Sequence, residues 1–250
     1  MALDVLAVGA HPDDVELGVG GIICSLTAAG RRVGIVDLTR GELGTRGTVK
    51  GREREAAAAA NILGVKIREN LAYRDGGVDN NRDQQRGLAT VIRRFKPQIL
   101  LLPPPVCRHP DHRRAAALGI DAAFFSGLSR FETHDDGEVQ GPWRPQHVLH
   151  YMLSASFTPT LVVDVSRFWD QRTRALLAFE SQFHVPGYKA ASDEPETFVS
   201  NADFLGWIEA RARTYGYPIG ATHAEPLLYH GGPLGVNDLF GVLSRTREFV

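Results

Sequence analysis

The chain has 250 residues, of which 43% are hydrophobic and 23% are charged, as in ordinary globular domains. Its 28 lysines and arginines nearly balance its 29 aspartates and glutamates, so the charge does not favour nucleic acid or a membrane surface as the main partner. Two cysteines are too few for a disulfide framework and favour a reducing compartment. No apolar run approaches the ~18 residues of a membrane-spanning helix, and the first residues lack a signal-peptide pattern. We therefore expect a cytoplasmic protein.

Apolar runs and helical patterns alternate along the first half of the chain. The expected strands are residues 3–8, 33–38, 70–73 and 98–102. The expected helices between and after them are residues 15–29, 52–63, 83–95 and 111–125. Strands that alternate with helices over short connections predict a parallel sheet with helices on both faces. The fold class is therefore α/β, with a Rossmann-like sheet.

The second half of the chain is less regular. Residues 129–146 are polar and rich in glycine, proline and aspartate, which indicates an exposed loop. Two more strands are expected at residues 147–153 and 161–165. Ser166 can cap a helix that reaches about residue 182, and Asn201 can cap a last helix that reaches Tyr215. Because no repeat, low-complexity tract or linker separates the halves, we expect a single domain over residues 1–250.

Two of the expected strands end in loops that contain histidine and aspartate. The first strand is followed by Gly9-Ala10-His11-Pro12-Asp13-Asp14, and the fourth by Arg108-His109-Pro110-Asp111-His112. Imidazole nitrogens and carboxylate oxygens are the ligands of catalytic zinc centres. Ligands of open parallel sheets bind at the carboxyl ends of the strands, where both loops fall. Each loop alone could be a helix cap, but the two together favour a metal-dependent active site.

Two other interpretations of these segments are disfavoured. The spacing Gly9-x-His11-x-x-Asp14 matches a dinucleotide-binding turn, but His and Asp stand where that turn needs glycines. Three glycines inside the first helix indicate close packing instead: Gly18, Gly20 and Gly21. Cys107 adjoins the second loop, but histidines and carboxylates already supply a complete ligand set. We expect core or surface positions for the other histidines: His134, His147, His150, His184, His223 and His230.

The two loops together resemble those of the zinc-dependent N-acetylglucosaminyl deacetylases, the LmbE or PIG-L family. The resemblance extends over nearly the whole chain in order. It also includes residues 37–48, Arg52-Glu53-Arg54-Glu55-Ala56, residues 61–65 and Glu180-Ser181-Gln182-Phe183. Within the family the chain is most similar to the deacetylases of bacillithiol biosynthesis, which remove acetate from N-acetylglucosaminyl malate.

The resemblance implies three zinc ligands, His11, Asp14 and His112. It implies that Asp13 is the general base and that His109, held by Asp111, assists at the transition state. The chemistry is consistent with these roles, since zinc lowers the pKa of bound water to ~7 and polarises a carbonyl. Asp13 can then accept a proton from the water, and protonated His109 can donate a hydrogen bond to the oxyanion.

The resemblance also implies substrate contacts for Arg52, Arg108 and Tyr188. Arg108 is expected to bind the malate, and Tyr188 to lie near the acetamide oxygen. One departure concerns the C-terminal segment, where the family often has Tyr-Ala-Glu and this chain has His223-Ala224-Glu225. The role of that segment is therefore left open.

The expected function is hydrolysis of the acetamide of an N-acetylglucosamine conjugate with Zn2+ as cofactor. N-acetylglucosaminyl malate is the expected substrate, and a mycothiol-type precursor or a chitooligosaccharide is the alternative. A nucleotide-dependent oxidoreductase and a non-catalytic binding module are disfavoured. The partner is a small amino sugar, with neither nucleic acid nor membrane involved, and the family resemblance suggests a homo-oligomer such as a hexamer.

Overall fold

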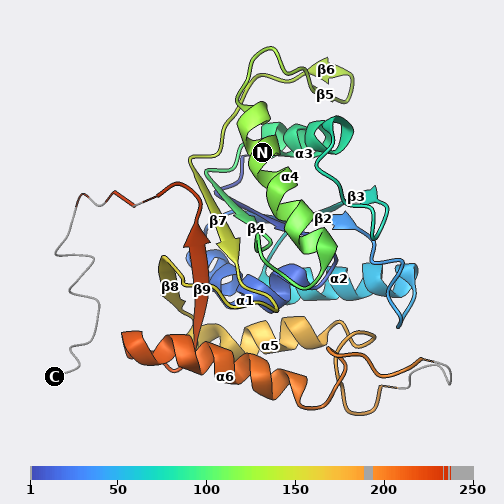
Figure 1. Ribbon diagram of the computed structural model, residues 1–250, viewed down its shortest axis with the longest axis vertical. Coiled ribbons are helices and arrows are strands. Elements are labelled where there is room, and N and C mark those ends of the chain that lie inside the picture. Colours follow the sequence, from blue (N-terminus) through green and yellow to red (C-terminus); the bar gives the residue numbers. More distant parts are fainter. Residues whose placement is uncertain (1, 189–193, 233, 236, 238–250) are drawn as a thin grey trace.

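A seven-stranded sheet forms the centre of the protein, which is described here by a computed structural model (Figure 1). The structure describes residues 2–188, 194–232, 234, 235 and 237. In spatial order the strands are β3 (Ile67–Tyr73), β2 (Val33–Thr39), β1 (Val5–Gly9), β4 (Ile99–Leu102), β7 (His147–Tyr151), β9 (Ala224–Tyr229) and β8 (Leu161–Asp164). The first five are parallel, and β9 is antiparallel to both of its neighbours.

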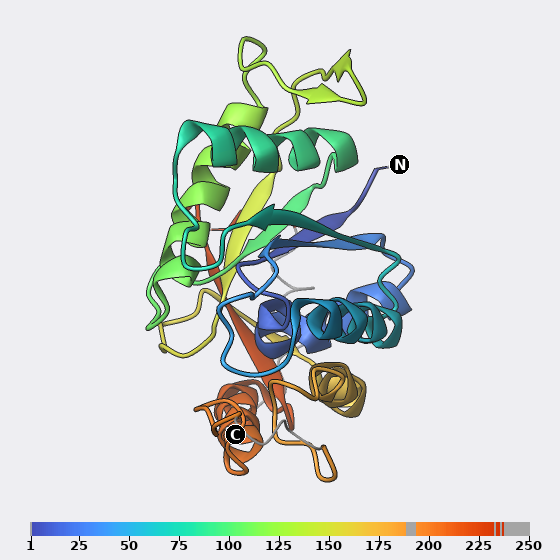
Figure 2. The same ribbon diagram turned by 90° about the vertical axis from the view of Figure 1, so that its right-hand side faces the viewer.

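Helices cover both faces of the sheet (Figure 2). One face carries α3 (Arg82–Phe95) and α4 (Pro110–Ser126), and the other carries α1 (Asp14–Ala28) and α2 (Val49–Leu63). Beyond α1 and α2 lie α5 (Trp169–Leu177) and α6 (Phe204–Gly216). The short pieces are β5 (His134–Asp135), β6 (Glu138–Val139) and two single 3-10 turns, Ser166–Phe168 and Tyr217–Ile219. No helix in the described part of the chain is long and apolar enough to cross a membrane.

The strand β1 explains why the sheet needs helices on both sides. All five of its residues are buried. Val5 and Ala7 belong to the core on the α1 side, whereas Leu6 and Val8 belong to the core on the α3 and α4 side. Successive side chains of a strand point to opposite faces, so a continuous apolar run requires a cover on each face.

The predicted α/β fold with a largely parallel sheet is confirmed, but several boundaries differ. Helix α2 begins earlier than expected because the Thr48 side chain caps it by accepting the Gly51 N–H at 3.0 Å. The expected loop 129–146 contains the small β5–β6 hairpin. Helix α5 ends at Leu177 rather than near residue 182. Strand β9 was not expected. It contains Pro226, a residue that is unusual inside strands, and it pairs with two strands that are distant in sequence, β7 and β8.

Candidate active site

A cavity of about 590 Å3 opens at the carboxyl edge of the sheet. The loops after all five parallel strands contribute to its wall, and α6 closes its far side. Residues that follow these strands and line the cavity include His11, Asp13, Asp14, Leu43, Thr45, Asp75, Arg108, His109, His112 and Ser154. The two histidine-containing loops therefore meet at one place, where ligands of open α/β sheets bind.

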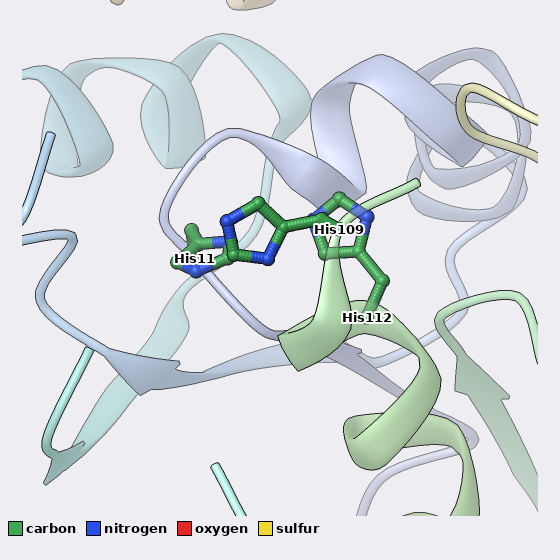
Figure 3. A group of neighbouring side chains, drawn as sticks. All are labelled: His11, His109 and His112. Carbon is green, nitrogen blue, oxygen red and sulfur yellow. The ribbon is translucent and has the colours of Figure 1, made fainter. Parts of the chain in front are cut away.

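Three imidazole rings converge in this cavity (Figure 3). His11 comes from the loop after β1, whereas His109 and His112 come from the start of α4. The ring centroids of His11 and His109 are 4.6 Å apart, and those of His109 and His112 are 4.9 Å apart. One nitrogen from each ring lies within 4.8 Å of the other two, so the group could hold a metal ion.

Asp14 connects two of these rings. Its Oδ1 lies 3.2 Å from Nε2 of His112, and its Oδ2 lies 3.5 Å from Nδ1 of His11. A tetrahedral metal with ligands at about 2.0–2.1 Å keeps its ligand atoms about 3.3–3.4 Å apart. Each of the two contacts has about this spacing, but they involve different oxygens of Asp14, so binding of one zinc ion by His11, Asp14 and His112 stays a prediction.

The second nitrogen of His11 faces two buried carboxylates. Nε2 lies 3.1 Å from Oδ1 of Asp75 and 3.5 Å from Oδ2 of Asp111. Burial opposes the charged ring, but hydrogen bonds with Asp111, Asp14 and Asp75 outweigh it and raise the pKa of His11 well above its usual value. Carboxylates that accept the outer N–H of a metal-binding histidine fix its orientation and tautomer. Asp75 was not predicted, and the only local signal was its position after an expected strand.

Asp111 contacts His109, as expected, through its backbone N–H. His109 is the N-cap of α4, and its Nδ1 accepts the backbone N–H of Asp111 at 3.2 Å. The carboxylate of Asp111 instead accepts the Gly76 N–H at 2.8 Å and faces His11. A ring that accepts at Nδ1 carries its proton on Nε2 when neutral.

The surroundings of His109 act against the protonated form that is expected from the sequence, and that form stays a prediction. Burial, together with the positive charges of His11 and His112, lowers the pKa of His109. A neutral His109 ring that accepts at Nδ1 can still donate a hydrogen bond through Nε2.

Asp13 is held in an unusual conformation beside these groups. It precedes α1 with φ of 118°, which non-glycine residues rarely adopt and which marks strain at functional sites. Its Oδ2 lies 3.2 Å from Nη2 of buried Arg52. Burial raises the pKa of Asp13 to about 7, although the Arg52 cation acts in the opposite direction. A carboxyl group that titrates near neutrality can both accept and return a proton.

Arg52→Met should move the acid limb of the pH profile of kcat/KM to higher pH. The Arg52 cation favours the ionised form of Asp13, so its removal raises the pKa of that carboxyl, and the base form then requires a higher pH. The measurement is kcat/KM across pH 5–9 at saturating metal. Arg54→Met is the matched control on the same helix, because Arg54 is exposed. An acid limb at the same pH in both variants would show that Arg52 does not set the ionisation of Asp13.

The other two substrate-contacting residues expected from the sequence lie in different places. Arg108 is exposed and lines the cavity, with its guanidinium carbon 4.5 Å from the ring centroid of Phe198. Tyr188 does not line the cavity, and it lies beneath Arg46 at 5.5 Å from the guanidinium carbon to the ring centroid. The structure thus brings Arg52 and Arg108 to the site but not Tyr188, whose contact with the acetamide stays a prediction.

Cys107 contacts the metal-ligand candidate His112, which the sequence did not indicate. Its Sγ lies 3.0 Å from Nδ1 of His112 and 2.9 Å from Oγ of Ser154. Burial opposes the thiolate, but hydrogen bonds from His112 and Ser154 outweigh it and lower the pKa of Cys107 to about 6. Cys107 Sγ contacts Nδ1 of His112, whose Nε2 faces Asp14.

Aromatic residues from the second half of the chain form the outer wall of the cavity: Phe183, Phe198, Phe204 and Trp207. The rings of Phe198 and Trp207 are stacked, with centroids 5.6 Å apart and an angle of 29° between their planes. Both side chains are about half exposed, at 49% and 50%. Sequence reasoning missed this wall, because nothing local places these four rings against the histidine loops.

Comparisons with known proteins identify relatives of this chain. The family model described as GlcNAc-PI de-N-acetylase (PIG-L) matches residues 6–123, which include both histidine loops. A diacetylchitobiose deacetylase from Thermococcus kodakarensis is 38% identical over 189 residues, which cover 72% of this chain and 70% of that protein. A probable N-acetyl-alpha-D-glucosaminyl L-malate deacetylase from Bacillus anthracis is 31% identical over 121 residues, which cover 43% of this chain and 54% of that protein. The solved structure of a conserved protein from Thermus thermophilus is similar with a TM-score of 0.82 and 35% identity, covering 94% of this chain and 98% of that one.

Proposed function

The chain belongs to the GlcNAc-PI de-N-acetylase (PIG-L) family, and we propose that it removes the acetyl group from the N-acetylglucosamine unit of a small conjugate. The observation that carries the proposal is the position of Asp13. The pKa of its carboxyl group is about 7. Asp13 directly precedes Asp14, and the two carboxylate oxygens of Asp14 face His11 and His112. Release of acetate from N-acetylglucosamine conjugates by the zinc-loaded protein, and its loss on chelation, test the proposal.

Five of the residues that line the cavity have distinct tasks in the proposed hydrolysis. A zinc ion held by His11, Asp14 and His112 would polarise the amide carbonyl and make water more acidic. Asp13 accepts the proton of the attacking water and later returns it to the departing amine. Nε2–H of His109 donates a hydrogen bond to the oxygen that becomes negative as the carbonyl carbon turns tetrahedral.

For the rest of the substrate we propose malate, on the basis of Arg108. No acidic side chain within the described residues pairs with its guanidinium. The guanidinium carbon of Arg108 lies over the Phe198 ring, and the N–H groups of a guanidinium point outward in its own plane. Such an edge can donate two parallel hydrogen bonds to a carboxylate. A malate carboxylate would meet this requirement, and a neutral sugar would not.

Arg108→Ala should reduce the preference for N-acetylglucosaminyl malate over free N-acetylglucosamine by about tenfold or more, because hydrogen bonds to charged groups contribute about 1.5–3 kcal/mol. The measurement is the ratio of kcat/KM for the two substrates, together with the metal content. Arg114→Ala, at an exposed arginine of helix α4, which follows the Arg108 loop, should leave the ratio unchanged. An undiminished ratio in Arg108→Ala would contradict the assignment of Arg108 to malate.

A second candidate substrate, diacetylchitobiose, is favoured by a different observation. The stacked rings of Phe198 and Trp207 line the cavity, and aromatic faces suit the apolar face of a second sugar ring. The relative from Thermococcus kodakarensis carries the name of that activity. Trp207→Ala discriminates between the candidates: it should lower kcat/KM for diacetylchitobiose if the disaccharide is the substrate, and it should spare the malate conjugate.

A further inference from the structure

Helix α1 is interrupted in its first half, and this break lies close to the candidate metal centre. The helix begins at Asp14, but Val19 has φ of −142° and ψ of 19°, which are not helical. An unbroken α-helix would join the Gly21 N–H to the carbonyl oxygen of Leu17. At the break both groups need other partners, because buried backbone polar groups are costly when unpaired.

A buried arginine and a buried glutamate supply those partners. The Leu17 carbonyl oxygen accepts a hydrogen bond from Nη2 of Arg172 at 2.7 Å. The Gly21 N–H donates to Oε1 of Glu225, and the Ile22 N–H donates to Oε2, both at 2.8 Å. Nε of Arg172 lies 3.8 Å from Oε1 of Glu225. Arg172 and Glu225 therefore supply the hydrogen-bond partners that the broken helix lacks at this point.

Glycines make room for this insertion. A Cβ atom at Gly20 would lie 2.8 Å from Cγ of Arg172. A Cβ atom at Gly21 would lie 2.7 Å from Cβ of Val165 and 3.0 Å from Oε1 of Glu225. The close packing expected for these glycines is thus confirmed, and its partner is the side-chain pair that bridges the break.

Stability alone does not explain this arrangement. Arg172 is 2% exposed and Glu225 is 4% exposed, and such buried ion pairs often stabilise a fold less than apolar residues of similar size. Arg172 belongs to α5 and Glu225 to β9, so two elements of the second half hold a helix of the first half. The direction of the segment from Asp14 to Gly18 depends on them.

We propose that Arg172 and Glu225 are positioning residues that set the bend in α1 and thereby place Asp14, and Asp13 before it, in the metal centre. This inference rests on the proposed function, since it assumes that Asp14 is a metal ligand. It gives the His223-Ala224-Glu225 segment a role, with Glu225 completing the backbone hydrogen bonds of the helix that begins at the site.

The test is metal affinity, measured by chelator competition on the whole protein. Glu225→Gln keeps one acceptor oxygen but leaves one N–H and the Arg172 charge without a partner. It should weaken zinc binding by about 10- to 100-fold, the loss typical of residues that orient metal ligands. At saturating zinc, kcat should recover much of its loss, because no catalytic residue has changed.

Gly21→Ala tests the same bend without removing a charge, and it serves if Glu225→Gln fails to fold. Its methyl group would lie 2.7 Å from Cβ of Val165 and 3.0 Å from Oε1 of Glu225, so the helix and the carboxylate must move apart and zinc affinity should fall in the same direction. Gly206→Ala is the matched control, since its Cβ would meet nothing within 4 Å. Wild-type zinc affinity in folded Glu225→Gln and Gly21→Ala would overturn the positioning role. Failure of the wild-type protein to bind zinc or release acetate would instead overturn the proposed function.

Discussion

Asp13→Asn should lower kcat by ~10²-fold or more while the protein keeps its metal, because an amide cannot accept the proton of the attacking water. The substitution is nearly isosteric, and asparagine tolerates the positive φ of 118° at this position. Asp13 adjoins the ligand candidate Asp14 but is not itself assigned as a ligand, so zinc affinity should change little. The measurements are acetate release at saturating substrate and the metal content of the purified variant.

The matched control is Asp136→Asn, at a second aspartate with positive φ, which lies in the turn between β5 and β6. It should leave both kcat and metal content unchanged. Loss of zinc in proportion to activity in Asp13→Asn would make Asp13 a ligand and would contradict its assignment as the base.

His112→Ala should weaken zinc binding by more than ~100-fold, since the loss of residues that only orient ligands already costs about 10- to 100-fold. The variant leaves two ligands, His11 and Asp14, and deprives Asp14 Oδ1 of the ring nitrogen now 3.2 Å away. Metal content after dialysis and affinity by chelator competition measure the effect. Exposed His134 provides the control, and His134→Ala should bind zinc like the wild type.

The same experiment separates two possible ligand sets. His11, His109 and His112 are also close enough to hold an ion together. His109→Ala should retain zinc and lose activity if His109 donates to the oxyanion. Loss of zinc in His109→Ala but not in an Asp14→Ala variant would reassign the third ligand.

Local sequence was sufficient to predict the strands and the two loops that build the centre of the site. Val5–Gly9 and Ile99–Leu102 are continuous apolar runs, and parallel strands place the residues that follow them at one edge of the sheet. His11 and Asp14 are three positions apart in sequence, and so are His109 and His112. Each pair therefore lies within about one turn of the chain. These features depend on neighbours in sequence, so the residue order determines them.

Tertiary structure alone decided which groups surround that centre. The Asp111 carboxylate faces His11, where it also accepts the Gly76 N–H from the loop after β3. The Glu225 carboxylate meets the Gly21 N–H across 204 residues of sequence, and Arg172 meets Leu17 across 155. Contacts of this kind depend on how packed elements direct their side chains, and no local pattern of spacing or hydrophobicity records that direction.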